Sequence, residues 1–271
     1  MIGQNKIKIQ IANLSTNNFP RVVSVIGRSG FGKTTVIKYL LSYLNISDTI
    51  TVNSIDDIRE VIKTAPNLSH NVAIHVDNFE KLNFRAKETL LKLCEDTPNF
   101  IYIFIEVTNS NLFSNQFMNR SLVLTLEPYS KNEIDGIIHS FGDLNDAEIE
   151  TLKSFLGSPK DFKLAVDYGH IDDLKIFIDT VYKNVSKAEP YNSMKILNKL
   201  KIKKDSTGID FNLFFNALYN ISFRNFYQSY SDNDFRLFNS CYKVLNVLNS
   251  NPNVNKKMLF DSFILSLKEI Q

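Results

Sequence analysis

The stretch that decides the fold reads Gly27-Arg28-Ser29-Gly30-Phe31-Gly32-Lys33-Thr34. It fits the phosphate-loop pattern G-x-x-x-x-G-K-[ST] in full. A short, β-branched apolar stretch, residues 21–26, precedes it, and apolar residues at helical spacing follow it over residues 33–44. Because the motif requires a strand before its glycines and a helix after them, this segment predicts a nucleotide-binding α/β domain.

The residue types of the loop suit phosphate binding. Glycines let the backbone curl so that its N–H groups face phosphate oxygens, and the start of the following helix favours an anion. Lys33 brings a positive charge to the β and γ phosphates, and the Thr34 hydroxyl can bind Mg²⁺. We therefore expect ATP and Mg²⁺ as cofactors. The expected nucleotide contacts are Gly27, Arg28, Ser29, Gly30, Phe31, Gly32, Lys33, Thr34 and Thr35.

A second metal ligand is expected at the end of another buried strand. Residues 71–77 form such a strand and end in Asp77, which we predict to be the acidic partner of Thr34. His75 lies inside the same strand. We interpret it as a satisfied sheet residue, because no Cys or His neighbours it at ligand spacing.

The residue after Asp77 bears on hydrolysis. Many ATPases have a glutamate there that positions the attacking water, whereas this chain has Asn78. An amide can hydrogen-bond a water but cannot take its proton. Glu80 lies two residues further on and is the alternative base. Nucleotide binding is therefore better supported than hydrolysis.

The first half of the chain alternates strand and helix patterns, which favours a parallel sheet covered by helices. Further strands are expected at residues 50–52, 100–107 and 122–126, and further helices at 55–64 (capped by Ser54) and 84–94. After Pro128 the pattern changes. Ser130 and Glu133 form a capping box that opens a helix, and from there to Gln271 we expect helices and no strand.

Composition excludes several classes of protein. A length of 271 residues suggests about two domains. The net charge of +2 excludes a strongly basic nucleic-acid binder. Cys94 and Cys241 cannot build a four-cysteine zinc site; one disulfide is possible, but buried thiols in a reducing compartment are expected. With no signal-peptide pattern and no long apolar run, we expect a cytoplasmic protein without membrane contact.

Several segments, in this order, resemble the AAA+ ATPases of the DNA polymerase clamp-loader family. Ile2-Gly3-Gln4 is similar to the segment before the phosphate loop, and residues 77–82 resemble the Walker B region. Residues 107–109 resemble sensor 1, 117–121 the Ser-Arg-Cys motif, 157–165 the start of the sensor 2 helix, and 249–265 the last collar helices.

The resemblance implies roles for three further residues. Thr108, at sensor 1, would reach the γ-phosphate or the attacking water. Arg120 would complete the ATP site of a neighbouring subunit, since a trans arginine stabilises charge on the transferred phosphoryl group. Lys160 stands where sensor 2 usually has arginine and would contact the nucleotide without arginine's bidentate geometry. The candidate catalytic residues are Lys33, Asp77, Asn78, Thr108 and Arg120.

The resemblance also implies an architecture and a function. The expected fold class is an α/β P-loop AAA+ domain with a parallel sheet (residues 1–128), a small helical lid (129–187) and an all-helical collar that holds subunits together (188–271). The expected function is that of an ATP-binding clamp-loader subunit. It would assemble with other loader subunits, identical or different, into a ring or spiral that opens a sliding clamp and places it on primer–template DNA.

Some features depart from the family. The Walker B glutamate, the Tyr-Arg-Pro segment near the adenine and the zinc cysteines of bacterial loaders are missing. A short, Lys- and Asn-rich chain without zinc resembles a virus-encoded or accessory subunit more closely, active in a bacterial cell or a phage-infected host. Arg85 and Lys87 are the DNA-contact candidates. The basic run of residues 199–204 is interpreted as a solvated face.

Two alternatives remain. One is a nucleotide-binding scaffold subunit with little hydrolysis, which Asn78 motivates. The other is an AAA+ helicase loader or initiator-like protein, although no helix-turn-helix signature is visible.

Overall fold

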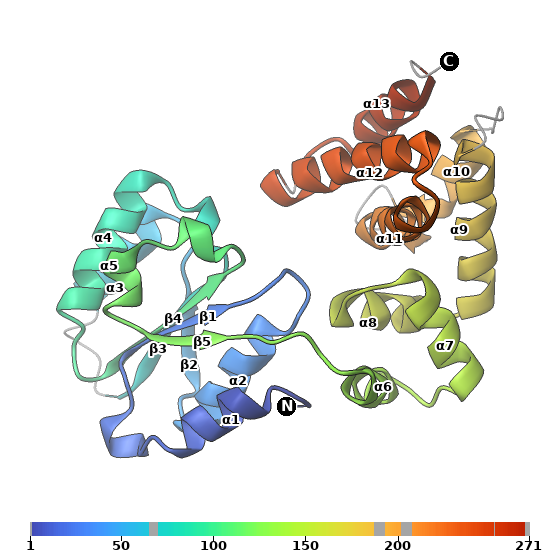
Figure 1. The fold of residues 1–271 in the computed structure, drawn as a ribbon. Helices are drawn as coiled ribbons and strands as arrows, with labels where there is room; N and C mark the ends of the chain where they lie inside the picture. The colour runs from blue at the N-terminus through green and yellow to red at the C-terminus, as the bar shows by residue number, and fades with distance from the viewer. Residues whose placement is uncertain (1, 65–69, 187–192, 202–207, 252, 269–271) are drawn as a thin grey trace. The chain divides into compact units, whose positions relative to one another are not determined.

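The computed structural model describes residues 2–64, 70–186, 193–201, 208–251 and 253–268. The chain divides into two compact units, Met1–Glu133 and Ile134–Gln271. Figure 1 shows the sheet of the first unit and the helices of the second. The linker expected at 188–193 lies outside the described residues, apart from Ser193.

The first unit contains a five-stranded sheet in which every pair of neighbouring strands is parallel. The strand order is β2-β3-β4-β1-β5. All five strands were expected from the sequence, although β2 begins two residues earlier than predicted. Their bounds are β1 (Val22–Ile26), β2 (Asp48–Thr51), β3 (Val72–Val76), β4 (Ile101–Val107) and β5 (Leu122–Thr125).

Helices cover both faces of this sheet, as a buried parallel sheet requires. Side chains alternate between the faces along each strand. Ile101 and Ile103 of β4 pack with α3 (Ile55–Thr64) and α4 (Phe84–Glu95). Phe104 packs on the other face with α1 (Asn5–Ala12) and α2 (Lys33–Tyr43). The same alternation places Glu106 of β4, and His75 of β3, on the face of α1 and α2.

Polar caps start the helices where the sequence predicts them. The Ser54 hydroxyl accepts the N–H of Asp57 at 3.2 Å, at the start of α3. Ser130 and Glu133 form the expected reciprocal pair before α6 (Lys131–His139), in which the N–H of Ser130 donates to Glu133 at 2.8 Å. Such caps satisfy N–H groups that have no partner within the helix.

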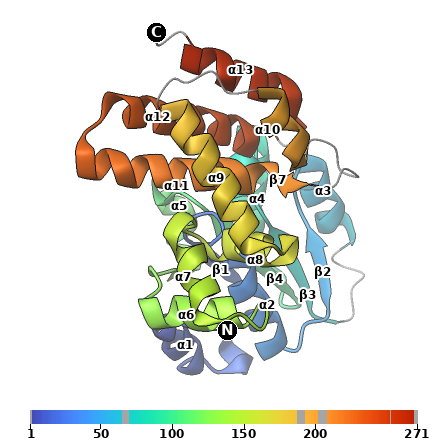
Figure 2. The ribbon, with the colours of Figure 1, turned by 90° about the vertical axis from the view of Figure 1, so that its right-hand side faces the viewer.

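The second unit is largely helical (Figure 2). It contains α7 (Asp146–Phe155), α8 (Pro159–Tyr168), α9 (Ile171–Ser186), α10 (Ser193–Lys199), α11 (Phe211–Ser229), α12 (Asp232–Ser250) and α13 (Lys256–Lys268). The expectation of no strand in this region was wrong. Leu200–Lys201 (β6) and Ile209–Asp210 (β7) pair in parallel. Two residues are too few to show an alternating pattern in the sequence.

Aromatic side chains form much of the core of the second unit. Phe215 is fully buried on α11, with its ring centroid 5.0 Å from that of Phe211 and 5.2 Å from that of Phe214. Phe263 of α13 meets the same ring edge-on at 4.9 Å. These contacts join α11 to the C-terminal helix.

Both cysteines are free and buried. Cys94 lies on α4 of the first unit and Cys241 on α12 of the second. Burial raises the pKa of Cys94 to about 12 and also raises the pKa of Cys241. Both therefore remain protonated thiols near neutral pH, in agreement with the expectation of buried thiols. Among the described residues, no helix combines the length and the apolar character that a membrane span needs.

Replacing Phe215 with alanine is expected to destabilise the second unit by about 3–5 kcal/mol, because it leaves a cavity among packed rings. Tyr227→Ala is the matched control on the same helix, since Tyr227 is 69% exposed. Urea unfolding followed by circular dichroism measures both. Equal destabilisation by the two substitutions would contradict this account of the core.

Candidate functional site

The phosphate loop has the backbone that its glycines allow. It follows β1 and ends at Lys33, the first residue of α2. Gly32 has a φ of 94°, in the left-handed region that favours glycine. At Gly27 a Cβ atom would lie 2.7 Å from the Leu126 side chain. A larger residue at either position would strain or displace the loop.

Lys33 is held inside this loop. Its Nζ donates to the carbonyls of Gly27 at 2.9 Å and Arg28 at 3.3 Å, and it lies 3.5 Å from the Thr108 hydroxyl. Burial lowers the pKa of Lys33, while the carboxylates of Glu106, Glu80 and Asp77 act in the opposite direction. The ammonium group thus stands between the phosphate loop and the loop after β4. An anionic ligand at this place could take over its hydrogen bonds.

Thr34 contacts a carboxylate that the sequence did not indicate. Its hydroxyl donates to Oε1 of Glu106 at 2.7 Å, and not to Asp77. The reason is the strand order. β4 is the direct neighbour of β1, with Val25 paired to Glu106, whereas β3 lies one strand further away.

Sequence reasoning missed Glu106. It is only 4% exposed, on a strand whose other residues are apolar or aromatic. A lone acidic residue in such a strand, two positions before Thr108, is the signal that could have identified it.

His75 belongs to the same group of side chains. Its Nε2 lies 3.0 Å from Oε1 of Glu106, so its ring is hydrogen-bonded, as expected of a satisfied sheet residue. One possible ligand atom each of His75, Asp77 and Glu106 lie within 4.8 Å of one another. His75 has no Cys or His at ligand spacing along the chain. In the tertiary structure, however, it lies beside two carboxylates that could bind a metal with it.

Asn78 and Glu80 follow the strand that ends near Asp77. The Asn78 amide donates to Oδ2 of Asp77 at 3.1 Å. Glu80 accepts the backbone N–H groups of Thr108 at 2.5 Å and Asn109 at 3.0 Å. Glu80 therefore holds the loop that carries Thr108, and one of its oxygens already has two donors.

Arg120 lies on the opposite edge of the sheet from the phosphate loop. It follows α5 (Asn115–Met118) and comes just before β5. β5 runs parallel to β1, so the start of β5 lies at the amino ends of the strands, whereas the phosphate loop leaves β1 at the carboxyl ends. Its guanidinium pairs with Glu95 at 2.7 Å and donates to the Gln116 carbonyl at 3.1 Å. Within its own chain, Arg120 is not placed to contact a nucleotide on the loop.

The N-terminal segment is attached beside the loop. The Gln4 side chain exchanges two hydrogen bonds with the backbone of Glu127, at 2.8 and 3.0 Å. The Tyr129 hydroxyl donates to the Phe31 carbonyl at 3.0 Å, and the two rings stack with their centroids 6.2 Å apart. Phe31 and the segment of Gln4 were expected to lie near the nucleotide, whereas no motif in the sequence indicated Tyr129.

Lys160 belongs to the second unit, in the first turn of α8, and is exposed. The neighbouring Asp161 is buried; its carboxylate accepts from the Ser158 hydroxyl at 2.8 Å and the Asn216 amide at 2.9 Å. Burial raises the pKa of Asp161. Asp161 anchors the start of the helix while Lys160 faces solvent.

Both candidate DNA contacts lie near the start of α4. Arg85 is exposed near the start of α4, and Lys87 has its Nζ 4.8 Å from the centre of the Phe79 ring. In the basic run, Lys199 stands over the Phe177 ring at 4.8 Å. Residues 202–204 of that run lie outside the described part of the chain.

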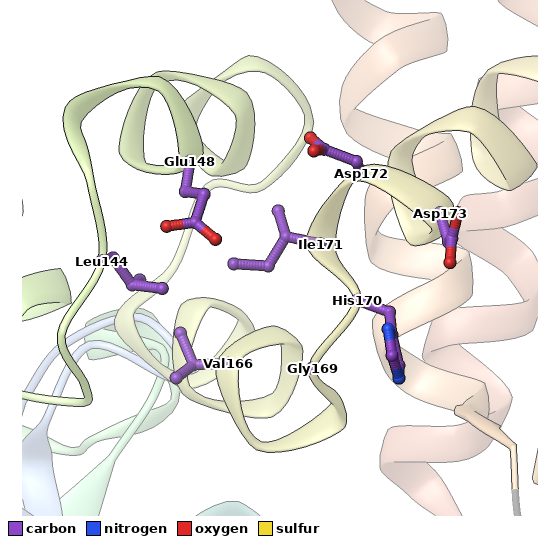
Figure 3. A pocket seen from close by; sticks show the side chains of 8 residues that line it. All are labelled: Leu144, Glu148, Val166, Gly169, His170, Ile171, Asp172 and Asp173. Atoms are coloured by element: carbon purple, nitrogen blue, oxygen red, sulfur yellow. The ribbon is translucent and has the colours of Figure 1, made fainter.

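A hollow of about 460 Å³ lies in the second unit. Figure 3 shows Leu144, Val166 and Ile171 lining it beside Glu148. The Glu148 carboxylate accepts the N–H of Asn145 at 2.9 Å and belongs to a helix cap. Glu148 therefore has a structural role in this hollow, and we place the candidate site at the phosphate loop.

The fold is of the AAA+ class expected from the sequence. It has a five-stranded parallel sheet, a phosphate loop between strand β1 and helix α2, and a helical region that follows. Solved structures agree with it. A DNA polymerase III gamma subunit-related protein of Thermotoga maritima is similar at 17% identity, with 98% of each chain covered and a TM-score of 0.51. RuvB of Thermotoga maritima, a Holliday junction branch migration motor, matches at 16% identity and a TM-score of 0.50, over 91% of this chain and 76% of RuvB.

These likenesses establish the fold. No protein-family model matches the sequence, and no curated protein matches it either.

Replacing Glu80 with alanine is expected to loosen the loop of Thr108, because two backbone N–H groups lose a charged acceptor. Such bonds contribute about 1.5–3 kcal/mol, so amide hydrogen exchange at Thr108 and Asn109 should become about tenfold faster or more. Glu88→Ala, at an exposed position of α4, is the control. Unchanged exchange in Glu80→Ala would show that Glu80 does not hold this loop.

Proposed function

We propose that this protein is an ATP-binding subunit of a clamp loader. It assembles with neighbouring subunits into a ring or spiral that opens a sliding clamp and places it on primer–template DNA. The observation that carries the proposal is the position of Lys33, which is bonded to the phosphate loop and lies beside Thr108, the candidate sensor 1 residue.

Nucleotide binding follows from the loop itself. In the proposed complex, phosphate oxygens accept hydrogen bonds from the loop N–H groups and from the Lys33 ammonium. For Lys33 these bonds replace those to the carbonyls of Gly27 and Arg28. Phosphate oxygens compensate the buried charge of Lys33 better than neutral carbonyls do. Thr108 would contact the terminal phosphate or a water beside it. Lys160 would contact the nucleotide as the family resemblance implies.

The side chains around Thr34 suit a divalent cation. Thr34 and Asp77 supply oxygen ligands, which Mg²⁺ prefers, and the buried Glu106 adds negative charge next to them. These residues would hold the ion. When bound, Mg²⁺ neutralises charge on the phosphate oxygens.

Arg120 supports an assembly in which each site is completed by a neighbour. Its place at the opposite edge of the sheet keeps it away from the loop of its own chain and makes it available to another subunit. A cation added across an interface stabilises charge on the transferred phosphoryl group. Nucleotide bound between subunits then favours the tight assembly, since a ligand shifts a population toward the state that binds it better.

DNA and a clamp are the proposed clients. The motif order of the clamp-loader family, together with the fold shared with the polymerase III gamma subunit-related protein, supports this choice. Arg85 and Lys87 would contact DNA phosphates, which position a duplex without reading its sequence.

Replacing Lys33 with methionine is expected to weaken ATP binding about tenfold or more, because the phosphates lose a charged donor. Calorimetry with the purified chain measures the binding. Retention of a purified sliding clamp by the immobilised chain and its partner subunits should need ATP and should be lost in the same variant.

Lys38→Met is the matched control, because Lys38 is exposed on the same helix. Absence of ATP binding by the unchanged protein would overturn the proposal. Retention of a purified replicative helicase in place of the clamp would favour the helicase-loader alternative.

Asn78 favours a second candidate function, a ring member that binds nucleotide but hydrolyses little. The amide cannot take a proton from water, and Glu80 is bonded to backbone N–H groups. If only a base is missing, Asn78→Glu should raise ATP hydrolysis by the assembled complex at least about tenfold, since general bases contribute about 10²–10⁴-fold. Rapid hydrolysis by the unchanged complex, with no gain in the variant, would contradict the scaffold function.

A further inference from the structure

His75, Asp77 and Glu106 form a cluster that sequence spacing did not reveal. His75 comes from β3, Asp77 follows that strand, and Glu106 comes from the adjacent strand β4. One nitrogen or oxygen of each side chain lies within 4.8 Å of the other two. An imidazole and two carboxylates at this separation make a possible set of metal ligands.

The spacing of His75 and Glu106 fits two ligands of a single ion. Two ligand atoms at right angles, each about 2.1 Å from a metal, are about 3.0 Å apart. Nε2 of His75 and Oε1 of Glu106 are separated by 3.0 Å. Glu106 is anchored on a central strand and is only 4% exposed, so its carboxylate is already positioned.

Charge also favours a cation here. A buried carboxylate is costly unless a positive group compensates it. Lys33 supplies one positive charge near Glu106 and Asp77, but its ammonium bonds to loop carbonyls and the Thr108 hydroxyl. The Thr34 hydroxyl and the His75 ring donate to Glu106. With Asp77, the cluster holds two carboxylates beside one imidazole.

We propose that His75, Asp77 and Glu106 bind a first-row transition-metal dication, for which Mn²⁺ serves as the probe, in preference to Mg²⁺. Mg²⁺ keeps an octahedral shell of oxygen ligands and several waters, whereas imidazole suits the transition metals. The ion binds Nε2 of the neutral His75 ring in the tautomer that carries its single proton on Nδ1. Selectivity for the ion thus comes from a residue of the sheet and not from the phosphate loop.

This inference deepens the proposed function and rests on it in one respect, because Asp77, the proposed Mg²⁺ ligand of the nucleotide complex, is assigned here to a transition-metal site of the nucleotide-free protein. The Thr34 hydroxyl shares Oε1 of Glu106 with His75, so an ion in the cluster would lie next to the position proposed for the phosphates. The protein's own three side chains nevertheless provide the site, and the ion should bind without any nucleotide.

The test is a titration of the nucleotide-free, full-length protein with Mn²⁺, followed by electron paramagnetic resonance. Spin-echo modulation should show coupling to a histidine nitrogen. In His75→Ala the coupling should vanish and affinity should fall about tenfold or more, as expected when a metal ligand is lost. His70→Ala is the matched control, because His70 lies before the start of β3, pairs with Asp48 and does not belong to the cluster.

Glu106→Gln provides a second variant that keeps the size of the side chain and should also weaken Mn²⁺ binding. Circular dichroism verifies that both variants fold. Unchanged Mn²⁺ affinity in His75→Ala, no nitrogen coupling in the unchanged protein, or equal affinity for Mg²⁺ would each overturn the inference. ATP binding measured separately by calorimetry distinguishes the two proposals: ATP binding without this Mn²⁺ site overturns only the metal inference, and Mn²⁺ binding without ATP binding overturns only the proposed function.

Discussion

The pairing of β1 with β4 is the constraint on which the candidate site depends. Both strands are buried on both faces, and their register places Val25 opposite Glu106 and Ile26 opposite Val107. The phosphate loop leaves β1 at the point where Thr108 leaves β4. A shift of one residue in this register would turn Glu106 away from Thr34 and bury an apolar side chain in its place.

Around this pairing the protein concentrates charge in a small volume. Lys33 loses hydration through burial, which lowers its pKa, while three carboxylates offset part of that cost. The Glu80 carboxylate accepts hydrogen bonds from two backbone N–H groups, and the Glu106 carboxylate accepts them from a hydroxyl and an imidazole. Buried charges are tolerated when they are bonded in this way. The remaining donors and acceptors are those that phosphates and a cation can use.

Local patterns in the sequence predicted most of the fold. Strands and helices of the first unit have clear apolar periodicity, and the phosphate loop, the Ser54 cap and the Ser130 capping box are signals within a few residues. The pair β6 and β7 escaped prediction because two-residue strands carry no periodicity. Glu106 escaped because its role arises from strand order and not from any motif in its own segment.

The sequence by itself determined the phosphate loop, the alternation that builds a parallel sheet, and the change to helices after Pro128, because each depends on neighbouring residues. Only the tertiary structure decided that Thr34 meets Glu106 and not Asp77, that Glu80 holds the Thr108 loop, and that His75 lies beside two carboxylates. These contacts join residues that are far apart in the chain. The order and register of the buried strands bring them together, and a pattern within one segment carries no information about that order.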